Sequence, residues 1–212
     1  MTLQRDKKAP ELSDARPSLD SSNQTALHRS LQSQIVLRSP TAGDGAAVND
    51  LIERCAPLDE NSIYCNLLQC SHFNETCVLA EAEDKVLGFV SGYLLPRDDE
   101  TLFIWQVAVD KRARGRKLAQ SMILELLHRP ACLNVSGLQT TITPTNKASQ
   151  ALFSTLAEQL DAPVEQRILF DRERHFGGDQ QSEVLWDIGP FDPEAVVLPS
   201  DTLGAQSVGR AA

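Results

Sequence analysis

The sequence predicts one α/β domain with a central mixed sheet flanked by helices, and three observations support this fold class. The 212 residues are enough for one well-buried domain, or for two only if both were small. Apolar periodicity gives the order β-α-α-β-β-β-α-β-α-β-β, which is typical of a mixed layer and not of a repeat array. An apolar strand over residues 102–109 passes through a short basic turn into an amphipathic helix.

Composition and charge exclude several classes of partner. Hydrophobic residues make up 42% of the chain and charged residues 23%, as in ordinary soluble proteins. The formal net charge of -9 argues against a nucleic-acid partner or an anionic membrane surface, because both select basic faces. No apolar run approaches the roughly 18 residues needed to span a bilayer. The charge suits a cationic small molecule, although many proteins are simply acidic.

The five cysteines indicate a reducing compartment. Their number is odd, their spacing is not that of a zinc site, and the N-terminus has no apolar signal segment. We therefore expect reduced thiols in a cytoplasmic protein with no bound metal.

The chain divides into three parts. Residues 1–33 are rich in Ser, Asp, Gln, Lys and Pro without apolar periodicity, which predicts a disordered leader. Residues 192–212 carry prolines and small residues and predict a disordered tail. Between them, residues 34–191 form the expected domain.

The first half of this domain is expected to begin with a short strand at 35–38. Asp44 is a candidate N-cap for a helix that Pro57 ends, and Ser62 is a candidate N-cap for a second helix. Residues 58–61 form the loop between them. Strands are expected over 77–81 and 86–95, and the connection 96–100 leads to the strand over 102–109.

The second half continues with the helix after the basic turn, which Pro130 ends after Leu127. A strand over 138–143 leads through Pro144 to a helix that runs to about Leu160. Strands over 164–170 and 182–188 complete the sheet, and residues 174–179 are expected to be a loop between them.

The basic turn over residues 112–119 predicts an anion site at a helix N-terminus. Gly115 lets the backbone tighten so that several amides face one anion, and four cationic side chains surround it. A solvated basic turn that merely caps a helix explains the same residues, so spacing alone leaves both interpretations open.

Two motifs in this region resemble those of the GNAT acetyltransferases. The segment hydrophobic-Gln-Val-Ala-Val-Asp, followed by Arg-x-x-Gly-x-x-Leu-Ala, resembles the motif whose turn binds the pyrophosphate of acetyl-CoA, and residues 146–153 are similar to the superfamily's next motif. The resemblance covers the whole domain and implies the GNAT fold, with acetyl-CoA as co-substrate. It implies that the cofactor lies against Val107, Ala108, Val109, Arg114, Gly115, Arg116, Lys117, Leu118, Ala119 and Asn146.

The sequence departs from the GNAT pattern at two positions. Lys117 stands where glycine or alanine is commoner, which is compatible with a backbone contact. Phe153 stands where many members have a tyrosine near the leaving thiol. Phenylalanine cannot donate a proton, so any general acid must come from elsewhere.

Two further stretches point to the acceptor. Residues 59–68 gather an acid, an amide, a hydroxyl and a phenol within one loop and the first turn of a helix, although a capping sequence explains Ser62 as well. Residues 174–179 place His175 beside a Gly-Gly pair, where an ordinary surface histidine is the alternative.

The wider stretches 58–68 and 172–186, together with residues 71–81 and 103–110 between them, resemble the L-2,4-diaminobutyrate acetyltransferases of ectoine biosynthesis, in the right order. The resemblance implies acetylation of the 4-amino group of L-2,4-diaminobutyrate by direct attack in a ternary complex, in a homodimer. On this basis Tyr64 or His175 handles protons, and Asp59 and Glu183 hold substrate ammonium groups. Ser62 and Trp105 complete the substrate-binding set, and core packing is the alternative for Trp105.

Two rival functions remain open. A GNAT enzyme for another amine, such as a polyamine, an amino sugar or a protein N-terminus, would share the donor motifs. A non-catalytic CoA-binding module is the rival from another class, and Phe153 is compatible with it.

Overall fold

A computed structural model describes residues 35–198 except Pro57 and Asp59. The predicted leader, Asp59 and residues 199–212 therefore lie outside the described residues. The described chain forms a seven-stranded sheet in the order β1-β2-β3-β4-β5-β7-β6, in which β4 and β5 are parallel and the other neighbours are antiparallel. The predicted mixed sheet and the GNAT fold are confirmed.

The elements follow the predicted order. The strands are β1 Val36–Arg38, β2 Val78–Ala82, β3 Lys85–Leu95, β4 Asp98–Val109, β5 Gly137–Ile142, β6 Val164–Phe170 and β7 Glu183–Ile188. The α-helices are α2 Gly45–Arg54, α3 Ile63–Ser71, α4 Leu118–Leu127, α5 Lys147–Gln159 and α6 Arg172–Phe176. Short 3-10 turns include η1 Ala42–Asp44, η2 Asn74–Thr76, η3 Lys111–Ala113, η4 Pro130–Cys132 and η5 Pro193–Ala195.

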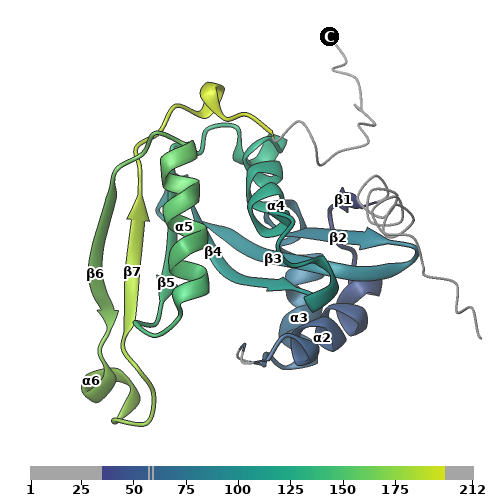
Figure 1. Ribbon diagram of the computed structural model, residues 1–212, viewed down its shortest axis with the longest axis horizontal. Helices are drawn as coiled ribbons and strands as arrows, with labels where there is room; N and C mark the ends of the chain where they lie inside the picture. The colour runs from purple at the N-terminus through teal and green to yellow at the C-terminus, as the bar shows by residue number, and fades with distance from the viewer. Residues whose placement is uncertain (1–34, 57, 59, 199–212) are drawn as a thin grey trace, which may run out of the picture.

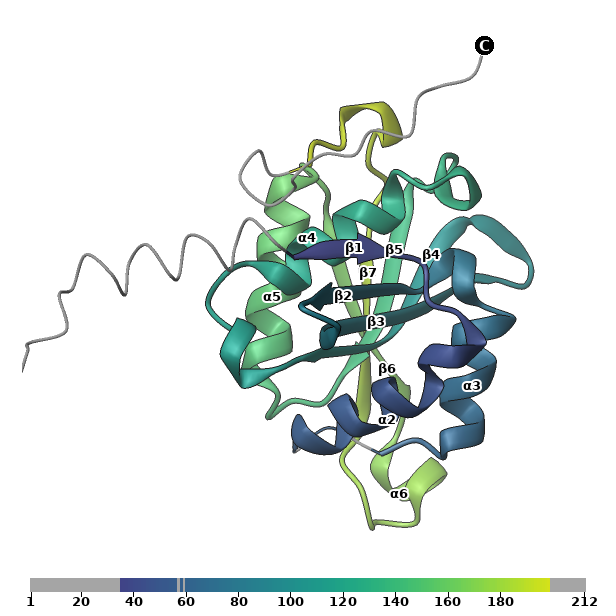
Figure 2. The ribbon, with the colours of Figure 1, turned by 90° about the vertical axis from the view of Figure 1, so that its right-hand side faces the viewer.

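Helices cover both faces of the sheet and define two apolar clusters. Figure 1 shows α4 and α5 on one face, and Figure 2 shows α2 and α3 on the other. The larger cluster packs α4 and α5 against the sheet, with Met122, Ile123 and Leu156 fully buried. The smaller cluster packs Leu51 and Ile52 of α2 beneath the other face.

The central strands separate at one end. Pairing of β4 with β5 ends at Phe103 opposite Gln139, yet β4 continues to Val109 and β5 to Ile142. Figure 1 shows the two strands diverging beyond this point. The backbone edge of residues 104–109 that faces β5 is therefore without a neighbouring strand in the described part of the chain. Such a wedge admits an extended ligand that can hydrogen-bond to strand backbone.

A β-bulge lies at the start of the wedge. Gly92 of β3 is opposite Ile104, and Ser91 is opposite Gln106, so Trp105 is the extra residue on β4. The bulge resets the alternation of side chains. Ile104 and Val107 both pack on the cluster under α4 and α5, whereas Ala108 faces α2.

The structure corrects two expected boundaries. The loop predicted over 174–179 includes the last three residues of α6. Asp171 caps this helix by accepting from the amides of Glu173 and Arg174 at 3.0 Å each, and Gly177 ends it with φ 61°. The connection predicted over 96–100 is shorter, because Asp98 already pairs with Leu95 across a two-residue turn. Both segments are polar, and hydrogen bonds rather than apolar burial order them.

The packed chain continues beyond residue 191. Val196 is buried, its carbonyl lies 2.9 Å from Nε2 of His128, and Leu198 packs on the larger cluster.

All five cysteines are free, and four of them are buried. Burial raises the pKa of the Cys77 thiol to about 12 and that of Cys132 to about 11, so these two are protonated at neutral pH. In the described ranges no helix combines the length and apolarity needed to cross a membrane.

We expect Gly92→Ala to destabilise the protein by about 2 kcal/mol. A Cβ at Gly92 would lie 2.8 Å from the carbonyl oxygen of Phe103 and 3.3 Å from that of Thr76, both of them backbone atoms. Gly43→Ala is the matched control, because its Cβ would meet the Thr41 hydroxyl at an ordinary 3.5 Å. Urea unfolding measures both, and equal effects would contradict this account of the bulge.

Candidate active site

The basic turn before α4 presents backbone amides to one side. Gly115 and Lys117 are both left-handed, with φ 73° and 57°. The amide of Ser121 makes the first hydrogen bond of the helix, to the carbonyl of Lys117 at 2.9 Å. The amides of Leu118, Ala119 and Gln120 precede this bond and belong to the helix turn that has no partner within the helix. They form the positive end of α4, where an anion is stabilised.

The side chains around the turn divide by what they bind. Nε and a terminal nitrogen of Arg112 each lie 2.9 Å from the Asp110 carboxylate, and Nε of Arg114 donates to the Val109 carbonyl at 3.1 Å. These two arginines therefore order the turn. Lys117 is exposed and Arg116 half-buried. Leu118 is buried in the core, so its backbone, not its side chain, can reach a ligand.

Asp110 anchors the turn to the rest of the fold. Its carboxylate accepts from the amide of Arg112 at 2.9 Å and lies 3.7 Å from the guanidinium of Arg54, at the end of α2. The hydrogen bonds from Arg112 hold the pKa of Asp110 at about 2, against a smaller opposing effect of burial. The sequence analysis assigned Asp110 no role beyond ending the strand, although an acid between an apolar strand and a basic turn is a visible signal.

The wedge lies at the ends of β4 and β5 that lead to the N-termini of α4 and α5. Val107 and Val109 pair with Val90 and Gly88 of β3, and their other edge faces the wedge. Asn146 is exposed at the N-terminus of α5, where its Oδ1 accepts from the amide of Ser149 at 3.1 Å. The side chain of Asn146 thus caps a helix in this structure, and its remaining donor group is on the exposed side.

Phe153 is a core residue of α5. Its side chain is 2% exposed and belongs to the larger apolar cluster. The residue that replaces the usual tyrosine therefore contributes packing.

The α2–α3 segment forms one side of the acceptor region. Ser62 accepts from the amide of Cys65 at 3.2 Å, so it is the N-cap of α3 and the capping interpretation is confirmed. Tyr64 is 68% exposed in the first turn of α3. Trp105 is 49% exposed and lies edge-on to Tyr93 at 6.4 Å, which is incompatible with simple core packing.

The β6–β7 hairpin carries the other candidates. His175 of α6 is exposed, its Nδ1 accepts from the amide of Asp171 at 2.7 Å, and its ring lies 5.7 Å from that of Phe170. That bond leaves Nε2 as the nitrogen available to a ligand. Glu183 begins β7 and is half-buried.

The structure does not bring Tyr64 and His175 into contact. Figure 1 places α6 at the end of the hairpin, away from α2 and α3. In the described part of the chain, no hydrogen bond or ring contact joins the two side chains. The candidates therefore form two groups, one on the α2–α3 segment and one on the β6–β7 hairpin.

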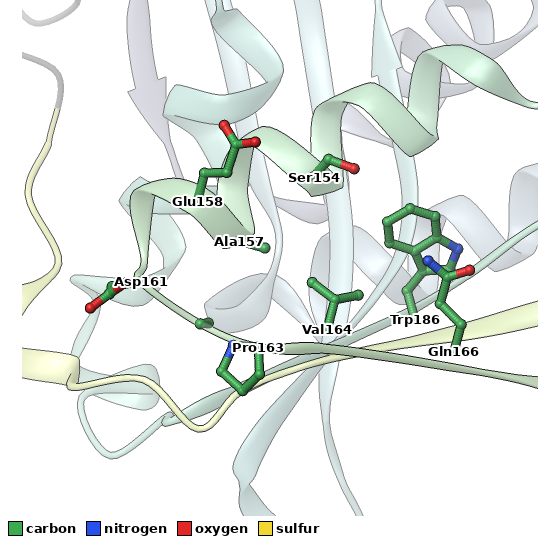
Figure 3. A pocket seen from close by; sticks show the side chains of 9 residues that line it. Ser154, Ala157, Glu158, Asp161, Pro163, Val164, Gln166 and Trp186 are labelled. Carbon is green, nitrogen blue, oxygen red and sulfur yellow. The ribbon is translucent and has the colours of Figure 1, made fainter.

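A separate hollow lies at the C-terminal end of α5. Figure 3 shows it between Glu158 and Asp161 on one side and Trp186 and Gln166 on the other, with a volume of about 440 Å³. None of the predicted site residues lines it. Since Asn146 precedes the opposite end of α5, the hollow is distinct from the wedge.

No group of three or more His, Cys, Asp or Glu side chains among the described residues has an arrangement that could hold a metal ion.

Comparison with known proteins identifies the family. Residues 46–157 match the model of the acetyltransferase (GNAT) family. An L-2,4-diaminobutyric acid acetyltransferase of Methylotuvimicrobium alcaliphilum is 51% identical over 157 residues, which are 74% of this chain and 91% of that protein. The enzyme of the same name from Bordetella parapertussis is 46% identical over 73% of this chain and 84% of its own length. This chain belongs to the L-2,4-diaminobutyric acid acetyltransferase family.

A solved member of the family gives the fold match. The diaminobutyrate acetyltransferase of Paenibacillus lautus, in complex with its substrate L-2,4-diaminobutyric acid and coenzyme A, is 39% identical, with a TM-score of 0.72. The match covers 76% of this chain and 97% of that one. The match therefore spans nearly the whole of that solved chain.

Asp110→Asn is expected to weaken acetyl-CoA binding about tenfold. The substitution removes the charge that Arg112 and Arg54 share, and it loosens the turn that positions the amides at the N-terminus of α4. Asp187→Asn is the matched control, because Asp187 pairs with Gln139 and Arg167 on the sheet edge. Titration calorimetry with acetyl-CoA measures both affinities, and an unchanged Kd for Asp110→Asn would contradict the anchoring role.

The effect of Asp110→Asn on the free energy of unfolding should depend on pH. An aspartate of the unfolded chain titrates near pH 3.9 and Asp110 near 2, so its contribution is complete above about pH 4 and is lost as the pH falls towards 2. The gap in unfolding free energy between wild type and Asp110→Asn should therefore be roughly 2 kcal/mol at pH 6 and narrow on acidification. Urea unfolding at several pH values measures it.

Proposed function

We propose that this chain transfers the acetyl group of acetyl-CoA to the 4-amino group of L-2,4-diaminobutyrate, giving N4-acetyl-L-2,4-diaminobutyrate. The observation that carries the proposal is the match to the Paenibacillus lautus enzyme over 97% of that chain, at 39% identity. That protein is described with L-2,4-diaminobutyric acid and coenzyme A bound, and its family includes relatives up to 51% identical to this chain.

The donor side of the site fits acetyl-CoA. We propose that the pyrophosphate lies on the amides of residues 115–119, with the charges of Arg116 and Lys117 beside it. The pantetheine arm would enter the wedge and hydrogen-bond to the backbone edge of residues 107–109, near Asn146. On this edge the Val109 carbonyl already accepts from Nε of Arg114. The same edge would stabilise the oxyanion that develops on the thioester carbonyl.

The reaction is a direct attack in a ternary complex. The substrate amine arrives as ammonium and loses a proton before its nitrogen attacks the thioester carbon. The carbon–sulfur bond then breaks and the thiolate of CoA leaves, taking up a proton. Tyr64 and His175 are the proposed proton carriers, since Phe153 has no proton to give. Because Nδ1 of His175 accepts from the amide of Asp171, the hydrogen of the neutral imidazole lies on Nε2, which can donate it to the leaving thiolate. Tyr64 is the proposed route for the proton that the substrate ammonium group loses.

Selectivity for one of the two substrate amines requires that candidate residues of both groups, on the α2–α3 segment and on the β6–β7 hairpin, hold the substrate in one orientation. We propose that Asp59 and Glu183 hold the ammonium groups of the substrate and that Ser62 and Trp105 line the site. The half-exposed indole of Trp105, at the bulge beside the wedge, offers a wall for the aliphatic part of the substrate. Asp59 lies outside the described residues, and its role rests on the sequence resemblance.

The family resemblance supports three wider proposals. The chain acts as a homodimer, in the cytoplasm, in the ectoine pathway by which cells accumulate an osmoprotective solute. We further propose that residues 34–191 form the catalytic domain, with Val196 and Leu198 of the following segment packed on its larger apolar cluster.

A panel of amines tests the proposed function. CoA release is followed with a thiol reagent for L-2,4-diaminobutyrate, a polyamine, an amino sugar and a peptide N-terminus, and NMR locates the acetyl group on the product. We expect turnover of diaminobutyrate with acetylation at N4. Preferred turnover of another amine would identify that amine as the acceptor in place of diaminobutyrate. Acetyl-CoA binding without turnover would favour the non-catalytic module.

Tyr64→Phe and His175→Ala should each lower kcat by about 100-fold and leave the Kd for acetyl-CoA within twofold. The reason is that proton transfer by a positioned side chain contributes about 10²–10⁴-fold, while neither residue faces the cofactor turn. His72→Ala, which removes an exposed histidine at the end of α3, is the control. Steady-state kinetics and calorimetry measure both, and full turnover in both variants would remove these residues from proton handling.

A further inference from the structure

A side-chain hydrogen bond joins the loop before α3 to strand β4. Nδ2 of Asn61, in the loop that leads to α3, donates to Oε1 of Gln106 on β4 at 3.0 Å, and both side chains are half-buried. The two residues are 45 positions apart in the chain. Gln106 lies between Trp105, the bulge residue, and Val107, which begins the backbone edge that faces the wedge.

The bulge is what directs Gln106 towards this loop. Ala108 faces α2, and alternate residues of a strand share a face, so Gln106 points to the same side. Without the extra residue at Trp105, the side chain of residue 106 would lie on the α4 face together with Ile104. The same bulge therefore lies at the start of the wedge and turns the side-chain amide of Gln106 towards the loop before α3.

The described part of the loop gives α3 a direct connection to β4. Leu58 packs on the smaller apolar cluster at one end of the loop, and Ser62 caps α3 at the other. Helix α3 packs chiefly on α2 and η1, and α2 packs on β3 and β4. The bond from Asn61 to Gln106 therefore adds a direct constraint between β4 and the start of α3, which carries Tyr64.

We propose that Gln106, through Asn61, is a positioning residue. It sets the distance between the start of α3, which carries Tyr64, and the thioester of the bound cofactor. This inference rests on the proposed function. Loss of the bond would let the start of α3, which carries Tyr64, shift relative to β4. A small shift of this kind reduces turnover and also lets the second amine of the substrate reach the carbonyl.

Three variants test the proposal. Gln106→Met removes the acceptor oxygen with little change of volume, Asn61→Ala removes the donor, and Gln106→Glu keeps an acceptor oxygen. Ser91→Ala is the matched control: Ser91 is the register partner of Gln106, and its buried hydroxyl has no hydrogen-bond partner among the described residues. Each variant is measured for kcat/KM with diaminobutyrate, Kd for acetyl-CoA, unfolding temperature and the ratio of N2- to N4-acetylated product.

We expect Gln106→Met and Asn61→Ala each to lower kcat/KM about tenfold and to produce detectable N2-acetylated product. The double variant should be no worse than either single one, because both break the same bond. Gln106→Glu should stay within about threefold of wild type, and Ser91→Ala should match wild type. Acetyl-CoA affinity should stay within twofold throughout.

Unchanged kcat/KM and product ratio in Gln106→Met would overturn the proposal, as would fully additive effects of the two substitutions. If Gln106→Met failed to fold, Asn61→Ala with its product ratio would still decide the question. Failure of the proposed function would appear differently, as a wild-type protein that does not acetylate diaminobutyrate at all.

Discussion

The separation of β4 from β5 is the constraint on which the rest of this structure depends. Parallel pairing stops at Phe103 and Gln139, and the strands continue apart for several residues. A sheet that stops pairing at its centre exposes backbone groups that normally require partners. The fold tolerates this opening because helices α4 and α5 cover one face of the sheet and α2 covers the other, so the apolar clusters stay closed while the edge stays free.

Electrostatics at the end of β4 complements the open edge. Asp110 is buried, caps η3 and binds Arg112, and this fixes the point from which the chain turns into α4. Two arginines that the sequence suggested as anion ligands are occupied with their own turn, through Asp110 and the Val109 carbonyl. Much of the positive potential towards a phosphate then comes from the helix end and its amides, which are rigid and cost little to organise on binding.

Local sequence signals predicted most of the fold and the donor side. The apolar strand, the glycine turn and the helix are contiguous, so one motif reports them together. The two ends of α6 were also signalled, by Asp171 as a cap and Gly177 as a stop, but four polar residues followed by Phe176 give no apolar periodicity. The bulge at Trp105 could not be foreseen, because it appears only when the register against β3 is known. For the same reason Gln106 could not be paired with Asn61 from the sequence.

The candidate acceptor residues that the structure describes lie in two groups that are not in contact with each other. One group includes Tyr64 on α3, and the hydrogen bond from Asn61 to Gln106 joins its loop to β4. The other includes His175 on α6, in the β6–β7 hairpin at the sheet edge. The most direct measurement of this account is a crystal structure with coenzyme A bound. It should show the pantetheine arm in the wedge beside residues 107–109 and the pyrophosphate on residues 115–119. Cofactor bound in the hollow between α5 and β6, with the wedge empty, would contradict it.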